Sequence, residues 1–161
     1  LTSEVLNIKE GLVQDKTMGL QRVKGKLHIE LLNIPTEIVR IEQQVSALFA
    51  SVSEQMQYAD ETSVYKMFQL TDLPDPNKLT TLLAPTNLEQ ESLLSLLFYT
   101  ATDINPINAA SPIKFTIKRN EITSLRVAYN SLEGKLEVWI LLDGQWKLIN
   151  QLDIKIEYND Y

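Results

Sequence analysis

The sequence predicts an α+β fold, with one N-terminal strand and two main helices packed on a C-terminal four-stranded antiparallel β-meander. Apolar residues recur at helical spacing over residues 35–58 and lie almost all round a second predicted helix between Thr86 and Phe98, whereas they alternate with polar residues after residue 112. The dipeptide Asp143-Gly144 adds the strongest hairpin signal in the chain. The 161 residues are 44% hydrophobic and 22% charged, which is typical of one globular domain spanning 1–161.

The first predicted element is a strand over residues 23–32. Its inward positions alternate with polar ones and are Val23, Gly25, Leu27, Ile29 and Leu31. A coiled coil is the competing interpretation, because a heptad spacing joins Leu27, Leu31, Ile34, Ile38, Ile41, Val45, Leu48 and Val52. Pro35 disfavours one continuous helix, since proline lacks an N–H and clashes with the preceding turn.

Two main helices are predicted to follow this strand. The first covers residues 35–58, opens with Pro35 in its first turn and carries one apolar stripe. Residues 72–77 form a loop, and a short helix ends at Pro85. The second main helix starts at Thr86, which has capping-box spacing to Glu89, and its leucine-rich sequence predicts a buried position.

The C-terminal meander is predicted from strands near residues 113–118, 123–129 and 135–142, and from residue 145 onward. Asp143-Gly144 suits a two-residue type I′ turn, which would set Leu141 opposite Trp146. One face of this hairpin would then carry Trp139, Leu141, Trp146, Leu148 and Leu152. The other face is also largely apolar, so we expect both faces of the sheet to be covered.

Composition excludes several classes of function. The absence of cysteine rules out disulfides, thiol nucleophiles and thiolate metal sites, and no glycine-rich phosphate motif is present. A net charge of −6 disfavours nucleic acid as a partner, and no apolar stretch is long enough for a membrane span. His28 is the single histidine, and its position on a polar strand face predicts a solvated side chain. We therefore expect no metal, no cofactor and a non-enzymatic function.

Two surfaces are candidates for binding. The first is the tryptophan-bearing face of the predicted hairpin, because tryptophan is enriched in interface hot spots; the alternative is that both tryptophans are core residues under the helices. The second and weaker candidate is an anion patch formed by Arg22, Lys24, Lys26 and His28. Its alternative is a charged outer strand face that keeps the strand soluble.

These observations favour a protein-interaction or assembly module that uses the apolar sheet face to bind a protein partner or to self-associate. The order of helices followed by a curved sheet resembles the NTF2-like and cystatin-like folds. That resemblance implies the alternative, a small-molecule pocket protein or pocket enzyme with acids such as Asp103 or Asp153 in its cavity. The start at Leu1 favours a processed product or part of a longer chain, and a cytoplasmic location is favoured.

Overall fold

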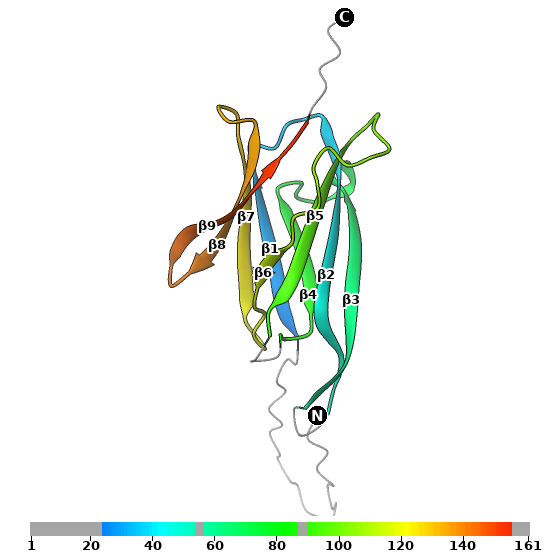
Figure 1. The fold of residues 1–161 in the computed structure, drawn as a ribbon, viewed down its shortest axis with the longest axis vertical. Helices are drawn as coiled ribbons and strands as arrows, with labels where there is room; N and C mark the ends of the chain where they lie inside the picture. Colours follow the sequence, from blue (N-terminus) through cyan, green and yellow to red (C-terminus); the bar gives the residue numbers. More distant parts are fainter. Residues whose placement is uncertain (1–23, 54–56, 87–89, 156–161) are drawn as a thin grey trace, which may run out of the picture.

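A computed structural model describes residues 24–53, 57–86 and 90–155, which form two β-sheets packed face to face (Figure 1). The five-stranded sheet has the order β4-β1-β7-β8-β9, and the four-stranded sheet has the order β3-β2-β5-β6. The strands are β1 (Gly25–Leu32), β2 (Ile38–Val52), β3 (Tyr58–Gln69), β4 (Lys78–Leu83), β5 (Ser92–Thr100), β6 (Ile113–Phe115), β7 (Ile122–Asn130), β8 (Lys135–Leu142) and β9 (Gln145–Asp153).

The predicted α+β fold is wrong. The described residues contain nine strands and one short 3₁₀ turn, η1 (Leu70–Asp72), but no α-helix. The NTF2-like and cystatin-like resemblance falls with it, because both architectures need helices packed against the sheet. The alternation predicted for the first strand is confirmed from Gly25 onward, since buried and half-buried residues alternate along the whole of β1. Val23, the first predicted inward position, lies outside the described residues.

The first predicted helix is instead the strand β2, and two irregularities explain why its pattern imitates a helix. The core-facing apolar residues of β2 are three, four and three positions apart: Ile38, Ile41, Val45 and Leu48. The pairing of β2 shifts once after Ile38 against β5 and once after Val45 against β3. Each shift adds a residue, so the strand spacing of two becomes three. Between Ile41 and Val45 the core-facing residue is polar: it is the buried Gln43, whose amide donates to the Thr81 hydroxyl at 3.1 Å.

The second predicted helix is also a strand, β5. Ser92, Leu94, Leu96 and Phe98 face the core, and Leu93 and Leu97 lie half-buried on the outer side. Thr86, the predicted helix cap, is buried; its hydroxyl lies 2.8 Å from the Ser92 hydroxyl and accepts the Ile117 N–H at 2.9 Å. Its predicted capping partner, Glu89, lies outside the described residues. The short helix predicted before Pro85 is the strand β4.

The predicted meander is confirmed only for β7, β8 and β9, which pair antiparallel in chain order. The first strand of the predicted meander, near residues 113–118, is β6, which belongs to the other sheet and pairs with β5. β7 pairs in parallel with β1, so the N-terminal strand joins the C-terminal ones in one sheet. The core lies between the two sheets and includes side chains from both, such as Ile29, Phe98 and Leu125.

Ala47 lies at the second irregularity of β2 with a φ of 55°, a left-handed conformation that costs an L-residue about 1–2 kcal/mol. Glycine adopts this conformation without steric cost but loses more chain entropy on folding. We expect Ala47→Gly to raise the free energy of unfolding by up to about 1 kcal/mol, measured by urea denaturation.

The control for this prediction is Ala59→Gly, because Ala59 is an exposed strand residue that has no positive φ. There the same substitution is expected to lower stability by about 0.5–1 kcal/mol. Equal effects at the two alanines would show that the conformation of Ala47 is not strained.

Candidate functional site

The β8–β9 hairpin projects from the body of the sandwich (Figure 1). Its turn residues Asp143 and Gly144 have φ values of 50° and 76°, which confirms the predicted type I′ turn. The predicted pairing is confirmed near the turn, where Leu141 lies opposite Trp146 and Trp139 lies opposite Leu148. These four residues share the outer face of the five-stranded sheet, and we call them the Trp face.

The Trp face points away from the four-stranded sheet, so the described part of the chain leaves it open to solvent. Leu141 and Leu148 are 38% and 44% exposed, and both indole rings are half-buried. The prediction that helices cover one side of this hairpin is wrong, and neither tryptophan belongs to the buried core.

The fifth residue predicted for this face, Leu152, lies on the opposite side. The pairing shifts between Val138 and Trp139, leaving Ile149 as an extra residue in β9. Because side chains alternate along a strand, one extra residue turns every later side chain to the other face. Leu152 therefore pairs with Leu136 and is buried in the core, 3% exposed.

Polar partners hold both indole rings in place. The guanidinium of Arg126 lies 4.0 Å from the centre of the Trp146 ring, and its Nε donates to Glu30 at 2.8 Å. The Trp139 ring nitrogen donates to Glu137 at 3.2 Å. Sequence reasoning missed Arg126 and Glu30. Both residues occupy outward positions in alternating strands, which is the one sequence signal they share. The pairing of β1 with β7 places them opposite each other.

The predicted anion patch is only partly assembled. Lys26 and His28 are half-buried on the outer face of β1, and Lys24 is exposed just before the strand. Arg22 lies outside the described residues. Lys26 is paired with Leu82 on one side and Ile122 on the other, both exposed apolar residues, so no second basic strand adjoins the patch.

The outer face of the four-stranded sheet carries a polar network around Tyr99. Its hydroxyl donates to Glu42 at 3.0 Å, and the Arg40 guanidinium stacks on its ring at 4.0 Å. Burial raises the pKa of the Tyr99 hydroxyl, and the hydrogen bond to the Glu42 carboxylate raises it further. Tyr99 thus stays a neutral donor at ordinary pH, and this network links β2 to β5.

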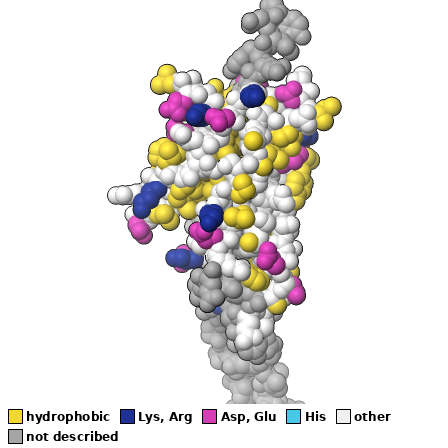
Figure 2. Space-filling view, viewed as in Figure 1, with side chains coloured by type: hydrophobic (Ala, Val, Ile, Leu, Met, Phe, Trp, Pro, Cys, Tyr) yellow, Lys and Arg dark blue, Asp and Glu magenta, His cyan; other side chains and the backbone are white. Residues whose placement is uncertain are grey.

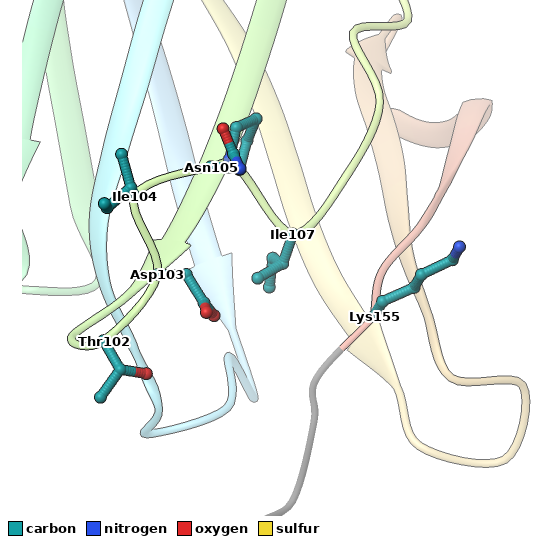
Figure 3. Close-up of a pocket in the computed structure, with 7 residues that line it drawn as sticks. Thr102, Asp103, Ile104, Asn105, Ile107 and Lys155 are labelled. Atoms are coloured by element: carbon teal, nitrogen blue, oxygen red, sulfur yellow. The ribbon is translucent and has the colours of Figure 1, made fainter.

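An open depression of about 390 Å³ lies beside the loop after β5 (Figure 3). The Thr100 hydroxyl donates to the Asp103 carboxylate, while the Lys155 side chain points away from that loop. The second acid considered for a pocket, Asp153, lies at the end of β9 and pairs with Lys135 at 3.5 Å. The cavity predicted between sheet and helices has no counterpart, because the described residues contain no α-helix to cover a sheet, and these two acids do not share a site.

Together the fold and the site define a two-sheet β-sandwich with an aromatic face on a projecting hairpin. Comparison with protein-family models, with curated proteins and with solved structures found no match. Within residues 24–53, 57–86 and 90–155, no group of three or more His, Cys, Asp or Glu side chains is arranged to hold a metal ion. The same residues include no helix long and apolar enough to cross a membrane.

Proposed function

We propose that this chain is a non-enzymatic protein-interaction module that binds a partner protein through the Trp face. The observation that supports the proposal is an aromatic and aliphatic surface left uncovered on a hairpin that projects from the fold. Surface leucines that occur singly need no explanation, but four adjacent apolar side chains that include two tryptophans are typical of a contact surface.

The chemistry of this surface suits protein recognition. Tryptophan and arginine are the residues most enriched in binding hot spots, and Arg126 stacks directly on Trp146. The salt bridge from Arg126 to Glu30 holds the guanidinium in that position, so little side-chain entropy remains to be lost on binding. Charged side chains contact both tryptophans, since Arg126 stacks on Trp146 and Glu137 accepts a hydrogen bond from the Trp139 ring nitrogen. Apolar side chains combined with polar groups are typical of protein interfaces.

The test is site-specific photo-crosslinking in the cells that make the protein. A photoreactive residue replacing Leu141 is expected to form one discrete adduct, whose partner is identified by mass spectrometry and then purified. We expect Trp146→Ala to weaken binding of that purified partner about tenfold or more. Light scattering of the chain alone, with and without this substitution, shows whether the partner is a second copy.

The matched control is a photoreactive residue at Leu132, which is 96% exposed in the turn between β7 and β8. Its adducts report how much nonspecific crosslinking occurs at any exposed leucine position. Adducts of the same mass and yield at both positions, or binding by the purified partner that Trp146→Ala leaves intact, would contradict a role for the Trp face.

A further inference from the structure

The free edge of β9 is a second binding feature of the projecting hairpin. Among the described strands, β9 ends the five-stranded sheet and has β8 alone as its neighbour there. The Leu142–Gln145 pair closes the type I′ turn with hydrogen bonds. In an antiparallel ladder bonded and non-bonded pairs alternate, so the N–H and C=O groups of Trp146 and Leu148 point toward the free edge.

The second half of this edge is blocked. The extra residue Ile149 interrupts the strand, and the side-chain oxygen of Asn150 accepts the Gln151 N–H at 2.8 Å. Bulges of this kind prevent pairing with another chain. Residues 145–148 are therefore the open part of the β9 edge.

The other edge strands are less suited to pairing. The ammonium of Lys66 donates to the Thr80 backbone carbonyl of β4 at 2.8 Å. β6 has only three residues, and the first half of β3 carries the adjacent acids Asp60 and Glu61. Short strands and edge charges are recognised ways of preventing strand addition.

Lys147 determines which charge is favourable on a strand that pairs with this edge. It is exposed between Trp146 and Leu148, on the other face of β9, and no described acid pairs with it. Lys135, near the base of the same hairpin, has Asp153 as its partner. Figure 2 shows hydrophobic side chains extending from this hairpin onto the body of the sandwich, with basic and acidic side chains at the hairpin itself.

A second copy of this chain is a poor occupant. Antiparallel pairing of two β9 edges would place Trp146 opposite Leu148 of the other copy, and then the two Lys147 side chains would face each other. Like charges directly opposite one another destabilise a strand pair, whereas opposite charges stabilise it.

We infer that residues 145–148 accept an extended segment of another protein as a sixth strand, with apolar residues beside Trp146 and Leu148 and an acidic residue opposite Lys147. The inference rests on the proposed function, because the added strand would lie along the Trp face. Backbone hydrogen bonds would supply affinity, and the alternating side chains would supply specificity.

The test uses the chain itself as the probe, since Lys147→Glu creates an edge with the inferred apolar–acidic–apolar pattern. A mixture of wild type and Lys147→Glu is expected to form a heterodimer about two- to fivefold tighter than either protein alone, measured by sedimentation equilibrium. Amide hydrogen exchange should show new protection at Trp146 and Leu148 in the mixture only.

Two controls separate strand addition from general charge attraction. Lys155→Glu makes the same charge change at an exposed site away from the edge, and mixing it with wild type should give no gain. Leu148→Pro removes the edge-facing N–H, together with the leucine side chain, and should abolish the heterodimer. The inference is overturned if the mixture is no tighter, if Lys155→Glu matches it, or if edge protection is absent.

These outcomes are distinct from a failure of the proposed function. If crosslinking at Leu141 depends on Trp146 but the edge amides gain no protection, the Trp face binds a protein and the inferred strand addition is wrong. Heterodimers with protected edge amides would support strand addition at β9. If no partner whose binding depends on Trp146 is then found, the proposed role of the Trp face is wrong.

Discussion

Asn108→Ala is expected to lower the free energy of unfolding by about 3 kcal/mol, one of the largest effects of any single polar substitution in this chain. β6 pairs with β5 only over Ser92–Leu94, so the rest of that edge of β5 needs other partners. Asn108 supplies them: its side-chain oxygen accepts the Phe98 N–H at 2.9 Å, and its amide nitrogen donates to the Leu96 carbonyl at 2.9 Å. Alanine would leave both backbone groups buried without partners.

Urea denaturation measures this effect, and Asn105→Ala is the matched control on the same loop. Asn105 is exposed, and its replacement is expected to change stability by less than about 0.5 kcal/mol. Hydrogen exchange at the Phe98 amide should accelerate in Asn108→Ala. If both variants unfold at the same urea concentration, Asn108 is not needed to complete the edge of β5.

The fold could be predicted only where local pattern and strand geometry agree. β1 and the β8–β9 hairpin follow simple alternation and a two-residue turn, and both were predicted. β2 was not, because Ala47 and the shift after Ile38 change its spacing from two to three. These irregularities are set by pairing with β3 and β5, which lie far along the chain. Strand preference depends on such neighbours more than helix preference does.

The candidate site, like the fold, could be predicted only where local sequence determines the strand pairing. The Asp143-Gly144 turn placed four residues of the Trp face correctly, because a two-residue loop fixes the pairs nearest to it. It could not place Leu152, since nothing local marks Ile149 as an extra residue. It also could not place Arg126 beside Trp146, because that contact spans β7, β8 and β9 and depends on how side chains cross the sheet.

The second large effect is expected at Gly25, the first residue of β1. A Cβ atom there would lie 2.4 Å from the Ile117 side chain and 2.5 Å from the Lys118 backbone carbonyl oxygen. The side chain can adjust, but the carbonyl belongs to the segment that leads from β6 to β7 and moves only with its backbone. We expect Gly25→Ala to lower the free energy of unfolding by about 3 kcal/mol, measured by urea denaturation.

Gly134→Ala is the control that isolates the cause. At Gly134 a Cβ would meet nothing within 4 Å, but φ is +65°, so its cost of about 1 kcal/mol is conformational. Both substitutions reduce the entropy of the unfolded chain equally, and that contribution cancels between them. The difference therefore measures how closely the chain between β6 and β7 passes β1. A Gly25→Ala protein as stable as Gly134→Ala would mean that this segment moves aside freely, and that the close packing of β1 against it contributes little to the fold.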